Sequence, residues 1–195
     1  MRWRPAPYLL SLVIVLCGCS ATGTLQDAPP GDAAATLSGL SAFKVNGRIA
    51  VQTATDASSA AITWLQRSDT DATLTLSGPL GMQATTLRRD GEQISLQQGD
   101  EIRWLEPEQL LSGEAPDWPL PLAELGWWLR GLPAPAQAAR QIRSGDRLSR
   151  LEQSGWTLQY EEYQTFNGLP LPRRIRFSRD DVSGKLLLKN WTFSP

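Results

Sequence analysis

The sequence predicts a mainly β protein: an open half-barrel of about 10–11 antiparallel strands, with short helices plugging an apolar cavity. Three observations predict this fold class. Segments of alternating apolar and polar residues recur from residue 42 to the end, and turn residues separate them. Two short helical patterns interrupt the series between residues 106 and 133. Alternation with one apolar face is typical of antiparallel strands that are covered on one side only.

The strands follow from the alternation. The first is predicted over residues 42–52, with Phe43, Val45, Ile49 and Val51 on one face. Later residues predicted on apolar faces are Ala60, Ile62, Trp64, Leu74, Leu76, Ile94, Leu96, Ile102, Trp104, Leu148, Leu151, Trp156, Leu158, Tyr160, Ile175 and Phe177. We expect a loop over residues 168–172 and a closing strand over residues 185–193. A long meander of such strands tends to curl so that its apolar face is enclosed.

Two helices are predicted between the strand groups. Residues 106–111 have Pro107 in the first turn and Gly113 beyond the end, which is the usual asymmetry of helix termini. Residues 121–131 carry leucines and Trp128 at helical spacing, with Trp127 beside them. This stripe fits ordinary core packing as well as a functional surface.

The apolar face is large and the helices offered to cover it are small, so the sequence predicts a partly empty cavity suited to an acyl chain. A fully packed barrel is the alternative. The predicted lining comprises Phe43, Val45, Ile49, Val51, Trp64, Leu74, Leu76, Ile94, Leu96, Trp104, Leu125, Trp128, Leu129, Trp156, Leu158, Ile175 and Phe177.

A tight turn is predicted at residues 77–81. Pro79 and Gly81 suit the second and fourth positions of a type I turn, which leaves Leu80 at the tip. A leucine exposed on a hairpin tip would suit contact with an apolar surface such as a membrane. The other interpretation is that Leu80 folds back onto the core.

The N-terminus has the features of an export signal. Arg2 and Arg4 precede an apolar run over residues 8–16, which is shorter than the ~20 residues of a membrane-spanning helix. The following Leu-Cys-Gly-Cys resembles the lipobox of bacterial lipoprotein precursors, and the resemblance implies cleavage before Cys19 and its lipidation. An ordinary cleaved signal is the alternative. We therefore expect a signal peptide over residues 1–18, a lipidated cysteine with a flexible tether over residues 19–38, and one domain over residues 39–195.

Charge and composition exclude several function classes. Without residues 1–18, which include two arginines, the chain has 17 basic and 20 acidic residues, a formal net charge of −3. This gives no electrostatic footprint for nucleic acid. The chain has no histidine, the commonest general base and metal ligand. We expect no enzymatic activity, no metal and no cofactor.

An ordered set of short motifs resembles the LolB family of outer-membrane lipoprotein receptors, from about Phe43 to Trp191. The stretches are Gly47-Arg48-Ile49-Ala50-Val51, Trp64 with Gln66, Gly78-Pro79-Leu80-Gly81, Leu110-Leu111, Leu120-Pro121, Trp128-Leu129-Arg130-Gly131-Leu132-Pro133, Gly155-Trp156, Tyr160 with Tyr163, Leu171-Pro172 and Lys189-Asn190-Trp191.

The resemblance implies a receptor, expected to be monomeric and anchored in the outer membrane facing the periplasm. It would take acylated lipoproteins from the periplasmic carrier LolA and insert them into the inner leaflet. Its partners would be LolA, lipoprotein acyl chains and outer-membrane lipid. The leucine of the Pro-Leu-Gly loop, here Leu80, would act in membrane insertion.

Two other classes of function are open at this stage. A structural or assembly lipoprotein would bind a protein partner through its sheet. A hydrolase without histidine would need a carboxylate pair. The adjacent acidic pairs at 161–162 and 180–181 do not suit that role, because neighbouring side chains on a strand point to opposite faces.

Overall fold

The computed structural model describes residues 32–78, 84–106 and 120–193. Within them, one antiparallel sheet of 11 strands is built in the order β6-β5-β4-β3-β2-β1-β11-β10-β9-β8-β7. The elements are α1 Asp32–Ser38, β1 Phe43–Gln52, β2 Ala57–Gln66, β3 Asp71–Ser77, β4 Thr85–Asp90, β5 Gln93–Gln98, β6 Glu101–Leu105, α3 Leu122–Leu129, β7 Ala139–Ser144, β8 Arg147–Gln153, β9 Trp156–Phe166, β10 Leu169–Arg179 and β11 Val182–Phe193.

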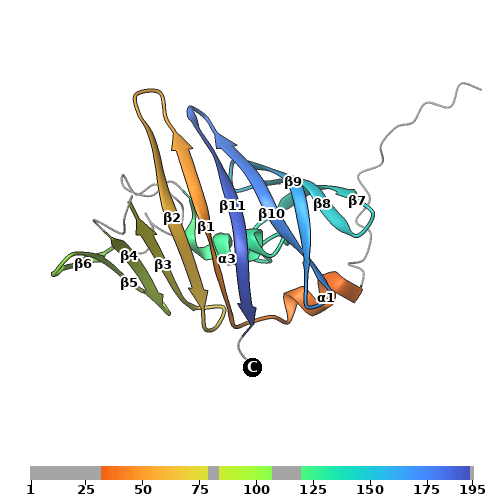
Figure 1. Cartoon of the computed structure of the whole chain (residues 1–195), viewed down its shortest axis with the longest axis horizontal. Coiled ribbons are helices and arrows are strands. Elements are labelled where there is room, and N and C mark those ends of the chain that lie inside the picture. Colours follow the sequence, from red (N-terminus) through yellow and green to blue (C-terminus); the bar gives the residue numbers. More distant parts are fainter. Residues whose placement is uncertain (1–31, 79–83, 107–119, 194–195) are drawn as a thin grey trace, which may run out of the picture.

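The sheet is open, because β6 and β7 stand at its two ends and do not pair with each other. The first and last strands meet in the middle, where β1 pairs with β11 from Phe43–Phe193 to Gln52–Ser183. Helix α3 lies across the far side of the central strands in the view of Figure 1. We call that side the inner face and the opposite side the outer face. The predicted fold class is confirmed.

The core lies on the inner face, as the alternation predicts. Phe43, Val45 and Ile49 of β1 are buried, while Lys44 and Arg48 between them are exposed. Leu148 and Leu151 of β8 are both buried although an odd number of positions separates them. The register between β7 and β8 shifts at this point, so one extra residue in β8 restores the inward direction.

Residues 169–172, predicted as a loop, are part of β10. The real turn is Asn167-Gly168, and both residues have positive φ, 49° and 78°. A two-residue turn of this kind matches the twist of the flanking strands, so Phe166 pairs directly with Leu169. The prolines weaken the ladder without ending the strand: the register shifts after Pro172, since proline has no N–H to donate.

The predicted flexible tether is wrong for its last residues. Residues 32–38 form α1, and Ala34 and Leu37 are buried in the core cluster. Two inward-facing apolar side chains are enough to dock one helical turn against the end of the sheet, next to β10. No helix among those described is long and apolar enough to cross a bilayer.

Candidate functional site

The candidate site is the inner face of the sheet together with α3. Most of the predicted cavity residues gather there, at 0–3% exposure: Phe43, Val45, Ile49, Trp64, Leu74, Ile94, Leu96, Leu125, Trp128, Leu129, Trp156, Leu158, Ile175 and Phe177. A side chain that lined a water-sized hollow would expose part of its surface to it. These side chains expose almost none, so the described residues of the inner face pack closely and leave no such hollow between them.

Helix α3 accounts for this close packing. Leu122, Leu125, Trp128 and Leu129 are buried on it, whereas Trp127 stays partly exposed. The helix approaches the sheet closely at Gly126, where a Cβ atom would collide with the side chain of Gln66 and touch Trp64. Glycine is therefore required at this point of the helix, despite its cost of about 1 kcal/mol relative to alanine.

Arg130 joins the end of α3 to the start of the domain. Its guanidinium is fully buried and donates to the carbonyl oxygens of Leu37 at 3.0 Å and Leu40 at 2.7 Å, and its Nε donates to Gly126 O at 3.1 Å. It also stacks 4.2 Å from the centre of the Trp127 ring.

No carboxylate neutralises this buried charge within the described residues. Burial lowers the pKa of Arg130 to about 10, against an opposing effect of the Asp69 charge, so the group is cationic at neutral pH. One guanidinium nitrogen, NH2, has no hydrogen-bond partner. Arg130 is thus an energetically costly group whose bonds connect the end of α3 to the last turn of α1 and to Leu40 just beyond it.

A second polar cluster holds the other side of α3. The indole N–H of Trp128 donates to Gln153 Oε1 at 2.8 Å, and the N–H of Ala134 donates to the same oxygen at 2.9 Å. The Gln153 amide in turn donates to the carbonyls of Ala134 and Gln137. In addition, the Tyr160 hydroxyl donates to Trp128 O at 3.1 Å. Helix α3 is therefore attached to the sheet by a small number of hydrogen bonds around a mainly apolar contact.

Glu124 brings a carboxylate into the same interface. Its Oε1 accepts a 2.6 Å hydrogen bond from the Ser154 hydroxyl, while its Oε2 is buried without a partner. Burial raises the pKa of Glu124 above its ordinary value of 4.5, and the bond from Ser154 opposes this shift.

We expect Glu124→Gln to stabilise the protein at neutral pH by about 1 kcal/mol, because it removes a buried charge with an unsatisfied oxygen. The raised pKa means that the folded protein binds the proton more tightly than the unfolded chain. Stability therefore falls as the pH rises from 4.5 through the raised pKa, and the variant should lack this fall. Urea unfolding across this pH range measures it. Exposed Glu92→Gln is the control, with less than about 0.5 kcal/mol expected at pH 7; an unchanged pH slope in Glu124→Gln would contradict the prediction.

Three predicted cavity residues lie elsewhere or at the margin. Val51 and Leu76 are half-buried at the rim of the core. Trp104 is 71% exposed, and the prediction that it lines the cavity is wrong. Leu96 on the inner face pairs with Arg103, so the alternation of β6 places Ile102 and Trp104 on the outer face.

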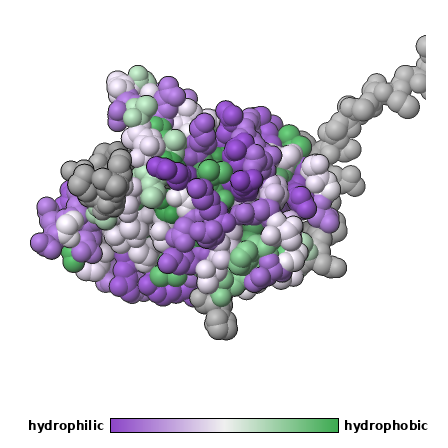
Figure 2. Space-filling model, in the orientation of Figure 1, coloured by the Kyte–Doolittle hydropathy of each residue, from purple (hydrophilic) through white to green (hydrophobic). Residues whose placement is uncertain are grey.

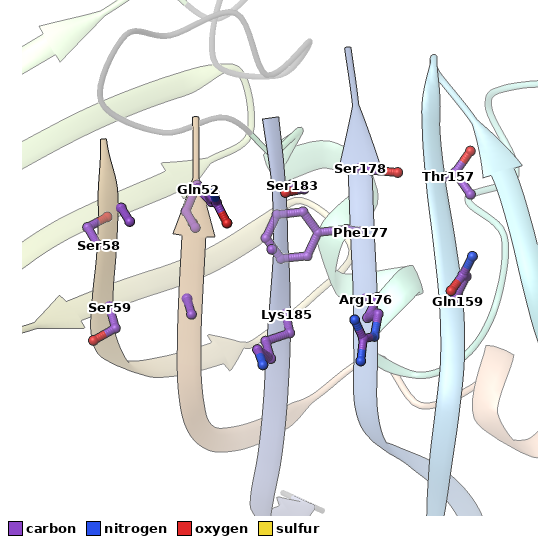
Figure 3. Close-up of a pocket in the computed structure, with 14 residues that line it drawn as sticks. Gln52, Ser58, Ser59, Thr157, Gln159, Arg176, Phe177, Ser178, Ser183 and Lys185 are labelled. Atoms are coloured by element: carbon purple, nitrogen blue, oxygen red, sulfur yellow. The ribbon is translucent and has the colours of Figure 1, made fainter. Parts of the chain in front are cut away.

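A groove of about 580 Å³ lies on the outer face of β2, β1, β11, β10 and β9 (Figure 3). Its lining is largely polar, with hydroxyl and amide side chains beside Arg176 and Lys185, and only Val51 and Phe177 belong to the predicted cavity set. Figure 2 shows this side covered mainly by hydrophilic residues over the central strands. The groove is thus not the predicted acyl-chain cavity.

Several predictions lie outside the described residues. They are Cys19 with the signal peptide, the Pro79-Leu80-Gly81 turn, and most of the helix expected at 106–111. Sequence reasoning also missed the polar residues that attach α3. Arg130 stood in a quoted motif, and the role considered for it was to steer the carrier, not to attach α3. Glu124 and Gln153 were not singled out, and their polar side chains in or near apolar stripes were the available signal.

Comparison with solved structures defines the class of protein. The chain resembles a LolA superfamily protein from Nitrosomonas europaea, with a TM-score of 0.56 and 13% identity over 80% of this chain and 87% of the other. It also resembles a putative outer membrane lipoprotein-sorting protein domain from Vibrio parahaemolyticus, with a TM-score of 0.58 and 8% identity over 83% and 91% of the two chains. The open sheet with its inner helix is therefore a fold that this chain shares with these two proteins.

Sequence comparison is more specific. The family model described as outer membrane lipoprotein LolB matches residues 41–191. Outer-membrane lipoprotein LolB of Pseudomonas fluorescens strain Pf-5 is 36% identical over 193 residues, covering 94% of this chain and 93% of the relative. The protein of that name from Stutzerimonas stutzeri strain A1501 is 37% identical over 190 residues, covering 92% and 91%.

The chain belongs to the LolB family. It is accordingly an outer-membrane lipoprotein with a role in lipoprotein localisation, and it is not an enzyme.

Proposed function

We propose that this protein accepts acylated lipoproteins from the periplasmic carrier LolA and inserts them into the inner leaflet of the outer membrane. The observation that carries the proposal is the inner face: a continuous set of large apolar side chains that, within the described residues, the eight-residue helix α3 covers. If the apolar core served stability alone, helix α3 would not need to be attached through Arg130, because the charge of this side chain is costly to bury.

The acyl-chain cavity, in this proposal, forms when α3 moves away from the sheet. The side chains then uncovered are those predicted from the sequence, among them Trp64, Leu74, Leu158 and Ile175. At ~0.8 kcal/mol per buried methylene, an acyl chain of ordinary length brings on the order of 10 kcal/mol to such a face. Against this gain stand the few hydrogen bonds that attach α3, each about 1 kcal/mol, and the apolar contacts of its buried side chains, each about 1.5–3 kcal/mol. The acyl chain therefore has to replace the apolar contacts of the helix with its own.

Handover then needs no nucleotide. A receiving face that binds acyl chains about 1.4 kcal/mol better than the carrier already gives a tenfold bias. The membrane is a still more favourable destination, since the chains are fully buried there. Lipidation at Cys19 would hold the protein near that membrane, and Leu80 would act at the final insertion step.

The experiment that tests this function uses the chain from residue 19 onward with Cys19→Ala, mixed with LolA carrying a lipoprotein. We expect the lipoprotein to leave the carrier and co-purify with the unacylated protein. If the lipoprotein stays on LolA at equimolar and tenfold higher acceptor concentrations, the proposed function is wrong. A protein that bound a folded partner without acyl chains would support the structural or assembly role instead.

A further inference from the structure

The outer face of β3, β4, β5 and β6 carries an apolar pair that the core does not use. Ile102 is 57% exposed and Trp104 is 71% exposed, and they are neighbours on one face of β6. Among the described residues, Ile142 on the opposite edge strand is the other exposed large apolar side chain, at 49%. Since β6 is the last strand of the sheet, no described strand lies beyond it.

The register shows what surrounds this pair. Trp104 lies opposite Ser95, Ser95 lies opposite Arg88, and Arg88 lies opposite Thr73. In the next row Ile102 lies opposite Gln97 and Thr86. Together with Arg67, Asp90 and Gln93, these residues line a groove of about 510 Å³.

One side of the groove is apolar and the other is charged. The apolar side lies on β6, and the other side carries two arginines, Arg67 and Arg88, and one carboxylate, that of Asp90. The guanidinium of Arg67 already forms an ion pair with Asp71 at 3.0 Å. The side chain of Arg88 is exposed, and within the described ranges its guanidinium has neither a hydrogen-bond partner nor an ion-pair partner. Its cation is therefore available to an anion outside the protein.

The position of the groove relates it to the turn that joins β3 and β4. The last paired row at this end of the sheet is Thr85, Gln98 and Glu101, and Thr85 is where the chain re-enters the sheet after that turn. Ile102 stands in the adjoining row. Ile102 thus lies next to the end of β4 at which the chain re-enters the sheet, and Trp104 lies two rows further along.

We propose that Ile102, Trp104 and Arg88 form a contact site for the surface of a phospholipid bilayer, separate from the inner face. Tryptophan is favoured at the level of lipid headgroups, where its ring is buried and its N–H stays hydrated. An unpaired arginine two strands away suits lipid phosphates, with which it makes bidentate hydrogen bonds. A bilayer is the occupant because the family is anchored at the outer membrane, which keeps this site within reach of lipid.

This inference does not depend on transfer of cargo, so its test can fail or succeed separately from the proposed function. The probe is vesicles of phosphatidylethanolamine and phosphatidylglycerol, three parts to one, mixed with the unacylated Cys19→Ala chain. We expect the double variant Ile102→Ser/Trp104→Ser to sediment with vesicles at least about tenfold more weakly than the parent, because two apolar anchors are lost. Arg88→Gln should weaken binding to these vesicles more than binding to phosphatidylcholine vesicles, whose headgroups carry a phosphate but no net negative charge.

Ile142→Ser is the matched control, since it removes an equally exposed side chain from the other edge strand and should bind as the parent does. All variants change exposed residues, and thermal unfolding checks that each is folded. Brominated lipid should quench the emission of the parent more than that of Trp104→Phe. Equal vesicle binding by the double variant and the parent would overturn the inference. So would a double variant that binds vesicles normally but no longer receives lipoprotein from LolA, which would make this surface a carrier contact.

Discussion

Leu80→Glu should leave acceptance of lipoproteins intact and abolish their release into liposomes. Leucine is favourable in a membrane by about 0.5 kcal/mol, whereas an acidic residue costs about 3 kcal/mol, so insertion of the turn should fall by more than about 100-fold. The residue lies outside the described part of the chain, and the expectation rests on its place between Pro79 and Gly81 in the sequence.

The measurement follows one lipoprotein through both steps. Lipoprotein bound to the Cys19→Ala protein is separated from LolA, then mixed with liposomes, and the fraction in the lipid is recorded over time. Leu80→Ile is the control, because it keeps an apolar side chain of the same size. Loss of acceptance in Leu80→Glu would place Leu80 at the inner face or at the carrier contact, and the assignment to membrane insertion would fail.

Arg130→Met should destabilise the protein by about 2–4 kcal/mol. The variant keeps an unbranched stem but leaves the carbonyls of Leu37 and Leu40 without their donor. Removal of a buried charge offsets part of this loss. Because these bonds connect the end of α3 to the end of α1 and to Leu40, the variant should also bind a fluorescent apolar probe in urea concentrations that leave the parent folded.

Two controls separate this effect from loss of charge in general. Arg176→Met removes an exposed arginine that pairs with Glu161 and should cost less than about 1 kcal/mol. Arg130→Lys keeps the charge and one nitrogen for the two carbonyls that Nη1 reaches, but it has no second donor for the Gly126 carbonyl, so an intermediate loss is expected. An Arg130→Met protein as stable as the parent, by urea unfolding, would show that these bonds do not hold α3.

Local patterns were sufficient for much of the fold. The alternation of Phe43, Val45 and Ile49 with charged residues fixes both the strand and its buried face. The helical spacing of Leu122, Leu125 and Leu129 does the same for α3. In both cases the periodicity of one segment contains all the information that is needed.

Other features depend on partners far away in the chain. Trp104 faces outward because Leu96 pairs with Arg103, and that register cannot be read from β6 alone. The roles of Arg130 and Gln153 rest on contacts across 90 and 25 positions, to Leu40 and Trp128 respectively. The filling of the inner face is a matter of volumes in three dimensions, for which a list of apolar positions is not enough.

Leu37 illustrates a third kind of difficulty. Its surroundings are rich in alanine, glycine and proline, which favours a flexible segment on composition. One leucine and one alanine nevertheless dock α1 on the domain, and Arg130 accounts for the attachment because it donates to the Leu37 carbonyl. Two buried apolar side chains and the hydrogen bonds of one distant arginine thus order a segment whose composition predicts disorder.

The central claim is that acyl chains occupy the face now beneath α3. A lipoprotein whose acyl chains carry a photoreactive group, transferred from LolA and irradiated, tests it directly, with crosslinked residues identified by mass spectrometry. We predict crosslinks to inner-face residues such as Trp64, Leu74 and Leu158. Crosslinks confined to the outer face, for example around Arg176 and Lys185, would show that the guest binds elsewhere and that α3 covers an ordinary core.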